Sequence, residues 1–515
     1  MKPKPILPIL CLVIIFTSTL TGAFSLFTTH RSQTLRATTG VSIQFEEDER
    51  ILERTVSSAE PTDFLLKKDS SESWWCKKGT PVLIDASIKD GYIFEGWYHN
   101  QEKIADTLQA NYIVEGYTLL SAHLTPIDEP EEPSNATAFA VYSSDDHSLS
   151  FYKRSKLPNL GDLYYDKTVT AIYPDIENLE ISNYKDVPWF NDYAEKIKMV
   201  HVVDTIRPNT LAFWFFFMYD CDTFHLEKLD TSMVTSMDYT FSCVAEDASS
   251  FVLDLNHWDT SNVQSMASMF EEAAVNADTF HLSLSTWNTS NVADMSNMFN
   301  EAGRYASTWI VDDLSTKVIA SPDAPSYLAW DVSNVKNMKA LFSCVGEGAD
   351  EFVLDVHNWN ISSVQDLSSM FGAFRRGKSG AIIHLDVSTK PITLENGTTY
   401  IAWDLSGYHG SLYYMFAYAG RSANTFSVDL STWDVSNVTS MKWMFYYTGQ
   451  NTANFYLGDL SNWNTGNVTS MDSMFKYAGQ KADYTLDLSS WDVSKVTAYG
   501  GFATGTGSHI VLPNF

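Results

Sequence analysis

One short sequence recurs eight times between Leu229 and Phe475 and dominates the chain. In its full form it reads Trp-Asp/Asn-Thr/Val-Ser-Asn-Val-x-x-Met-x-x-Met-Phe, as at Trp258–Phe270, Trp287–Phe299 and Trp433–Phe445. A unit of about 29 residues cannot bury its own apolar face, so the units must stack on one another around a continuous core. The repeat therefore predicts a solenoid, and solenoid surfaces more often bind than catalyse.

Each unit contains an apolar pattern that favours a short helical turn. The apolar residues follow the Trp at offsets of 5, 8, 11 and 12, as in Val263, Met266, Met269 and Phe270. Steps of three, three and one match one inward face of a helix. Ser261 and Asn262 stand where such a helix needs its first amides capped. Gly303 and its equivalents stand where it would end in a left-handed residue.

An alternating run follows each predicted turn, as in Phe251–Asn256. Alternation predicts a half-buried strand. Parallel stacking of one strand per unit would place one outward column of polar side chains along the solenoid: Asp254, Ser283, Asp355, Asp429 and Asp487. The expected fold class is therefore a right-handed α/β repeat solenoid, with one short strand and one short helical turn per rung.

Two units carry an insertion of about fourteen residues. Both insertions follow a predicted strand and begin with the same three residues, Ser315-Thr316-Lys317 and Ser388-Thr389-Lys390. We expect them to leave the same edge of the solenoid, two rungs apart. The last unit, beginning at Trp491, lacks the Met-x-x-Met-Phe sequence and reads as a terminal cap.

The chain before the repeats divides into four segments. Residues 1–30 contain Lys2 and Lys4 and then the uncharged run from Ile6 to Phe24, which predicts an export signal. It is either cleaved after Ala23 or retained as an anchor. Residues 41–125 predict a small all-β module, 126–136 an acidic Pro-rich linker, and 137–228 an aromatic N-terminal cap and lead-in for the solenoid at 229–515. The remainder is expected to be extracellular, either secreted or attached through that N-terminal helix.

Charge and motif content limit the function. The chain of 515 residues has 34 Lys and Arg against 63 Asp and Glu, a formal charge of −29. Such a chain repels phosphate backbones, so nucleic acid is not an expected partner. It lacks a nucleophile elbow, a phosphate-binding Gly loop and zinc-ligand spacing. We therefore expect no enzyme activity, cofactor or metal, and we interpret the Asp or Asn after each Trp as a turn-forming group.

A group of aromatic residues lies beside the predicted helical turns of the later units. Rings on a rigid surface can anchor a protein or stack on a sugar. Inward packing between rungs is the alternative for some of them. The candidate binding surface combines the polar column, the two insertion lysines and five rings: Tyr413, Tyr414, Trp443, Tyr446 and Tyr447.

Two resemblances to known families agree with this organisation. The Gly-Tyr-x-Phe-x-Gly-Trp core at residues 91–97 resembles the internalin-type B-repeat of bacterial surface proteins. The repeats resemble those of the BspA-like leucine-rich-repeat surface proteins of bacteria, as in the unit Trp-Asp-Val-Ser-Asn-Val-Thr-Ser-Met-Lys-Trp-Met-Phe and its equivalents. The second resemblance implies a secreted or surface-attached binding protein, sometimes linked to adhesion, with no catalytic residues to transfer.

These observations predict a non-enzymatic extracellular binding or adhesion scaffold with a protein or glycan partner. The membrane would be contacted only through the N-terminal segment, if that segment is retained. A structural spacer without a dedicated ligand is the second hypothesis. A polysaccharide-acting solenoid enzyme is the third.

Overall fold

The structure is a computed structural model with two compact units, Met1–Glu132 and Pro133–Phe515. It describes residues 40–126 apart from short stretches between strands, and residues 135–515 apart from 166, 321–324, 377–378 and 507–509. The expected export segment and most of the expected linker lie outside these residues. In the described part of the chain, no helix has the length and apolar character needed to cross a membrane.

In its described residues, the first unit has nine strands in two sheets. Their order is β3-β4-β1-β9-β6-β7 in one sheet and β2-β5-β8 in the other. Trp97 of the Gly-Trp core is fully buried, and its Nε1 donates to the Leu108 carbonyl over 3.1 Å. The strands are β1 (Gly40–Phe45), β2 (Ile51–Ser58), β3 (Leu66–Lys68), β4 (Ser73–Lys77), β5 (Thr80–Ile88), β6 (Tyr92–His99), β7 (Glu102–Ala105), β8 (Ala110–Val114) and β9 (Thr118–Pro126).

The second unit begins with a five-stranded sheet of order β14-β10-β11-β15-β16. Its aromatic core includes Phe151, Trp189 and Trp214, whose rings meet in pairs at 5.4 Å. The elements are β10 (Thr137–Ser143), β11 (Ser148–Arg154), β12 (Leu163–Tyr164), β13 (Lys167–Thr168), β14 (Ala171–Pro174), η1 (Ile176–Asn178), η2 (Tyr184–Asp186), α1 (Phe190–Tyr193), η3 (Ala194–Lys196), β15 (Met199–Val202) and β16 (Thr223–His225).

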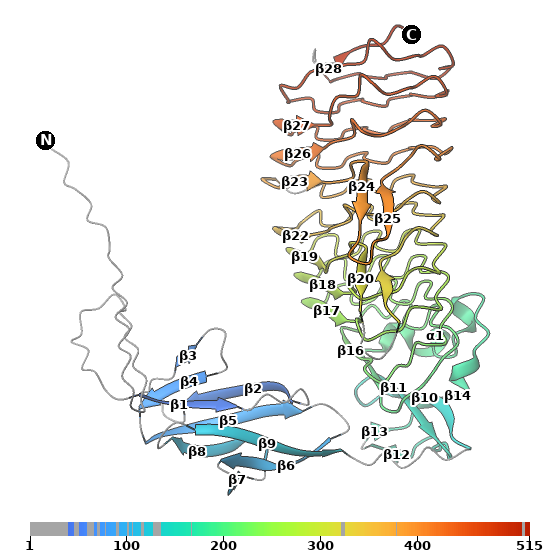
Figure 1. The fold of residues 1–515 in the computed structure, drawn as a ribbon. Helices are drawn as coiled ribbons and strands as arrows, with labels where there is room; N and C mark the ends of the chain where they lie inside the picture. Colours follow the sequence, from blue (N-terminus) through green and yellow to red (C-terminus); the bar gives the residue numbers. More distant parts are fainter. Residues whose placement is uncertain are drawn as a thin grey trace, which may run out of the picture. The chain divides into compact units, whose positions relative to one another are not determined.

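The repeats form a stack of rungs with one short parallel strand in most of them (Figure 1). Phe251 pairs with Phe280, and Leu253 with Leu282, so apolar side chains of neighbouring rungs meet inside. The stacked strands are β17 (Ser250–Asp254), β18 (Thr279–Ser283), β19 (Thr308–Val311), β22 (Glu351–Val353), β23 (Ile382–Leu385), β26 (Thr425–Val428), β27 (Asn454–Tyr456), β28 (Leu486–Asp487) and β29 (Ile510–Val511).

The predicted helical turn after each Trp is wrong, and so is the α/β fold class. Among the described residues the one α-helix is α1, which has four residues and lies ahead of the rungs. Met266 N–H donates to Asp294 O of the next rung over 2.9 Å, and Ser268 N–H donates to Ser296 O over 2.8 Å. An α-helix would direct these groups four residues back along its own chain. The solenoid is therefore built from strands and turns.

The segment that replaces the helix is a chain of linked β-turns, which we call the turn ladder (residues 265–274 and their equivalents). Met269 N–H donates to the Met266 carbonyl over 3.3 Å, and Ala273 N–H donates to the Phe270 carbonyl over 3.1 Å. The third residues of these turns, Ser268 and Glu272, both have φ of 54°, as in type II turns. A chain of such turns places a side chain inward about every three residues. Its apolar spacing is therefore the same as that of one face of a helix.

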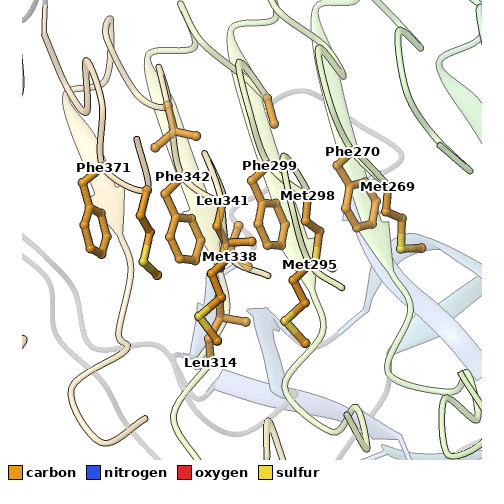
Figure 2. Close-up of a cluster of buried hydrophobic side chains, with 14 of the residues drawn as sticks. Met269, Phe270, Met295, Met298, Phe299, Leu314, Met338, Leu341, Phe342 and Phe371 are labelled. Atoms are coloured by element: carbon orange, nitrogen blue, oxygen red, sulfur yellow. The ribbon is translucent and has the colours of Figure 1, made fainter. Parts of the chain in front are cut away.

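The core is a set of side-chain columns that run through the rungs. Figure 2 shows Phe270, Phe299, Phe342 and Phe371 in one such column beside the methionines. The Phe270 and Phe299 ring centroids are 5.6 Å apart and the rings are 7° from parallel. Each fully buried Phe or Met contributes about 1.5–3 kcal/mol to folding. The sequence repeats because each rung must supply the same apolar side chain to each column.

The residues expected to cap helices join the rungs instead. Asn291 Nδ2 donates to the Ser261 carbonyl of the preceding rung over 2.7 Å, and Asn262 does the same to Ser232. Gly303 is left-handed at φ 51°, as expected, but it ends a turn ladder. A Cβ there would lie 2.5 Å from Phe280 Cβ, so the rung requires glycine at this position.

Candidate binding surface

The predicted polar column lies on the strand side of the rungs, and its aspartates form hydrogen bonds within the turns that follow the strands. Asp254 and Ser283 are register partners, which places them on the same column. Asp429 Oδ1 accepts from Ser431 N over 3.0 Å, and Asp487 Oδ1 accepts from Ser489 N over 3.0 Å. Hydrogen bonds from the Ser489 side chain and backbone hold the pKa of Asp487 below its ordinary value. A carboxylate that closes its own turn has a structural role on each rung that carries one.

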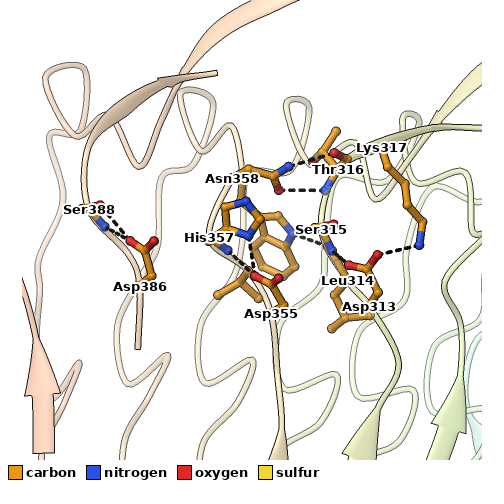
Figure 3. Close-up of polar contacts among 12 residues, drawn as sticks. Asp313, Leu314, Ser315, Thr316, Lys317, Asp355, His357, Asn358, Asp386 and Ser388 are labelled. Carbon is orange, nitrogen blue, oxygen red and sulfur yellow. Dashed lines mark hydrogen bonds and ion pairs between the residues drawn. The ribbon is translucent and has the colours of Figure 1, made fainter. Parts of the chain in front are cut away.

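The second aspartate of the column, Asp355, also contacts a histidine ring. Asp355 Oδ1 accepts from His357 N over 3.1 Å and lies 2.6 Å from His357 Nδ1 (Figure 3). The same turn bond forms at Asp254, which accepts from Asn256 N over 3.0 Å. We find no feature of this column that distinguishes a binding rung from the others.

Each insertion forms a β-hairpin, and both hairpins lie along one flank of the rungs (Figure 1). The first pairs β20 (Lys317–Ile319) with β21 (Tyr327–Ala329), and the second pairs β24 (Lys390–Thr393) with β25 (Thr399–Ala402). Lys317 Nζ lies 2.8 Å from Asp313 Oδ2, and Lys390 pairs in the same way with Asp386. The two predicted lysines are therefore engaged within their own hairpins.

Burial and hydrogen bonding act in opposite directions on these two carboxyls. Burial disfavours the charged form of Asp313, but the bonds from Lys317 and Ser315 outweigh it and lower the pKa. Asp386 has the same balance, with Lys390 and Ser388 as partners. Both carboxylates are thus charged and paired with the lysine that begins each hairpin.

Buried polar bonds also tie the hairpins to neighbouring rungs. Asn358 accepts from Thr316 N and donates to Thr316 O, both over 2.8 Å (Figure 3). Tyr327 Oη donates to the Thr286 carbonyl, and Tyr400 Oη donates to the Asn358 carbonyl, each over 2.7 Å. The hairpins are therefore held against the solenoid surface by these hydrogen bonds.

A polar groove opens beside the first hairpin. Its volume is about 550 Å³, and its lining includes Asn256, Asp259, Ser261, Asn288 and Tyr327. Asp259 Oδ1 accepts from Ser261 N over 2.9 Å, which is the turn role expected for the residue after the Trp. The groove is thus a hollow between polar turns of the scaffold.

The five predicted rings do come together, on the turn ladders of the rungs of Trp403 and Trp433. Trp443 is the centre of the group, 5.7 Å from both Tyr413 and Tyr446 between ring centroids. Tyr446 and Tyr447 are 4.6 Å apart. With Tyr418 and Tyr477 these rings form a continuous surface, which we call the aromatic face: Tyr413, Tyr414, Tyr418, Trp443, Tyr446, Tyr447 and Tyr477.

The aromatic face is partly exposed. Tyr413 is 36% exposed and the other six rings are half-buried, whereas Phe416 and Phe445 of the same ladders are buried. Burial raises the pKa of Tyr414 and of Tyr446 to about 12. Both hydroxyls therefore remain protonated, and able to donate, at neutral pH.

The rings of this face are a property of particular rungs and are not required by the fold. Tyr414 and Trp443 occupy the first left-handed position of the turn ladder, with φ of 60° and 59°. The same position holds small or polar residues in five other rungs, Ser268, Asn297, Ala340, Ser369 and Ser473, and a ring, Tyr239, in the first rung. Since the fold accepts those residues there, bulky rings at this position indicate another role.

The sequence analysis missed the cations that accompany the rings. Arg421 Cζ lies 5.7 Å from the Tyr418 ring centroid and 5.0 Å from that of Tyr447. Lys442 Nζ lies 4.8 Å above Trp443. Two further cations complete the set, Arg376 over Tyr418 at 4.8 Å and Lys476 at 5.9 Å from both Tyr446 and Tyr477. The available signal was the common position of the two arginines, each five residues after the Phe of its unit.

The four cations stand out in so acidic a chain. Ion pairs of the described solenoid form elsewhere, as at Arg304 with Glu301 and Glu347, and none within 4 Å includes Arg376, Arg421, Lys442 or Lys476. Arg421 Nε instead donates to Gln450 Oε1 over 2.8 Å. These cations are available to an anionic ligand.

Comparison with known proteins gives one family. Its description is "Mycoplasma protein of unknown function, DUF285", and it matches residues 209–318, 324–379 and 401–507, more than half of the chain. The chain belongs to the DUF285 family. The matched DUF285 segments include the turn ladders and the root of the first hairpin at Asp313–Lys317, whereas Asp386 and Lys390 of the second hairpin lie outside them. Neither a curated protein nor a solved structure matches the chain. Within the described residues, His, Cys, Asp and Glu form no group of three that could hold a metal ion.

Proposed function

We propose that this protein is a non-enzymatic binding protein of the cell exterior, and that it binds its partner through the aromatic face. The observation that carries the proposal is that Tyr414 and Trp443 cluster with further rings, at a position where five other rungs have Ser, Asn or Ala. Tyr, Trp and Arg are the residues that most often dominate binding energy at interfaces. The uncharged run at residues 6–24 and the resemblance to BspA-like surface proteins support export.

A rigid support favours this role. Neighbouring turn ladders are joined by backbone bonds, such as Tyr414 N–H to Lys442 O over 3.2 Å and Tyr418 N–H to Tyr446 O over 2.7 Å. The rings are therefore held before a partner arrives. Preorganised side chains lose less conformational entropy on binding than free ones, which improves affinity.

The test is a binding panel of extracellular matrix proteins and glycans against the chain from residue 31 onward, which contains both described units. The variant Tyr414→Ser/Trp443→Ser takes serine from the equivalent positions Ser369 and Ser473. The matched control is Asp429→Ser, which takes serine from Ser283 of the polar column. We expect saturable binding that the first variant loses and the control keeps.

Other results would decide against this proposal. Binding that survives in the ring variant but disappears on removal of either hairpin would move the site to the hairpins. No binding to any member of the panel would favour a spacer. Hydrolysis of a polysaccharide would replace a binding function by an enzymatic one.

A further inference from the structure

The aromatic face presents groups that favour negative charge. The Tyr418 and Tyr447 rings are 5.2 Å apart and 8° from parallel, so each covers one face of the other. Arg421 lies over both rings, and Lys442 lies over Trp443. The four cations and six of the seven rings are half-buried, so both remain partly accessible, and a ring with one face covered still offers its edge. The edge of an aromatic ring is its electropositive part.

This positive surface is short and has acidic surroundings. At roughly 4.8 Å per rung, the rungs that hold Arg376, Arg421, Lys442 and Lys476 span about 15 Å. The turn ladders nearer the N-terminus carry Glu271, Glu272 and Glu301 instead. Asp472, whose carbonyl accepts from Trp443 N–H, and Glu347 lie beside the face. Burial raises the pKa of Glu347, and the charges of Arg304 and, less strongly, Arg376 oppose that shift. A long uniform polyanion or an anionic membrane would meet repulsion beyond the face.

We propose that the aromatic face binds a short acidic peptide segment of a partner protein. An extended chain covers about 3.3 Å per residue, so about five residues would span the four cations. Their carboxylates would accept charge-assisted hydrogen bonds from Arg421, Lys442 and Lys476. Tyr, Trp and Arg together are the composition of protein interface centres, and the covered ring faces leave less area for stacking on sugars. This inference depends on the proposed function, because it names the ligand of the same surface.

The experiment measures fluorescence polarisation of a labelled hexaglutamate peptide with the chain from residue 31 onward, and uses hexaglutamine as the uncharged control. The variant Arg421→Gln/Lys442→Ser takes residues found in the same columns, Gln450 and Ser368. Lys317→Gln/Lys390→Gln removes the same charge from the hairpins and serves as the matched control.

We expect saturable hexaglutamate binding that weakens about tenfold or more in the first variant and remains unchanged in the hairpin variant. Binding should weaken at high salt, since exposed charges are screened. Equal binding by both variants, or hexaglutamine binding as tight as hexaglutamate, would overturn the inference. A sulfated oligosaccharide that binds through the face when hexaglutamate does not would also overturn it.

The outcome is separable from that of the proposed function. If Tyr414→Ser/Trp443→Ser abolishes binding to a member of the extracellular panel but hexaglutamate does not bind, the binding function stands and the acidic-peptide inference fails. If neither the panel nor the peptide binds, both fail.

Discussion

The indole N–H of Trp287 donates to the backbone carbonyl of Leu255, 32 residues earlier and one rung back, over 2.8 Å. The same bond recurs from Trp330 to Leu284 and from Trp359 to Leu314. Each of these three Trp side chains therefore fills the core and also satisfies a buried carbonyl of the preceding rung. Phe could fill the space, but it could not donate the bond, which explains why the repeat uses Trp.

The first Trp of the series provides a natural control for this bond. Trp258 is as buried as its successors, yet its Nε1 has no hydrogen-bond partner among the described residues. Trp287→Phe should lower the free energy of unfolding by about 2–3 kcal/mol, since it removes buried volume and one hydrogen bond. Trp258→Phe should cost about 1 kcal/mol less. Urea unfolding measures both, and equal losses would contradict the role given to the bond.

Ser268 has two features that destabilise the native rung. Its φ is 54°, and its buried hydroxyl has no partner among the described residues. Ser268→Gly removes both and should raise the free energy of unfolding by about 1 kcal/mol. Ser268→Ala removes only the hydroxyl, so its gain should be smaller. A loss of stability on replacement by Gly would show that the left-handed turn is not strained.

The asparagine bonds between rungs should be measurable at an exposed site. Asn291→Ala removes the 2.7 Å bond from Nδ2 to the Ser261 carbonyl and should cost about 0.5–1.5 kcal/mol. Asn424→Ala, at an exposed side chain without a recorded bond of its own, is the control. If chemical denaturation gives the same loss in the free energy of unfolding for both variants, the Asn291 side chain does not stabilise the stacking of rungs.

The ion pair at the first hairpin predicts a dependence on pH. The folded-state pKa of Asp313 is lowered, so its contribution to stability exists above the ordinary Asp pKa and is lost as pH falls. Asp313→Asn should therefore lower the melting temperature at neutral pH and have little effect near pH 2. Lys317→Gln should give the same loss at neutral pH, and the double variant no further loss. A constant difference at every pH would exclude the ion pair as the cause.

The sequence alone predicted which side chains point inward, but it did not predict the backbone conformation that carries them. Val263, Met266, Met269 and Phe270 are all buried, as their spacing predicted. That spacing is common to a helix and a chain of turns. The choice depends on whether backbone N–H groups bond within the rung or to the next one. In this protein the next rung offers carbonyls such as Asp294 O, so the turn ladder forms.

The same limitation applied to the candidate site. The rings were predicted from their positions beside the Met-Phe pairs, and they do form one surface. The cations were missed because a helical arrangement does not place Arg421 over both Tyr418 and Tyr447, whereas stacked turn ladders do. Lys317 and Lys390 looked available because the sequence did not show their pairing with Asp313 and Asp386.

The most direct test of the binding face is hydroxyl-radical footprinting of the chain with and without a partner captured from the extracellular panel. We predict that the partner protects Tyr413, Trp443 and Tyr446 from oxidation. Tyr305 and Tyr499, which are 52% and 47% exposed, should be oxidised equally in both samples. Unchanged oxidation of Tyr413 and Trp443, with protection at the hairpins or the polar column, would contradict the account.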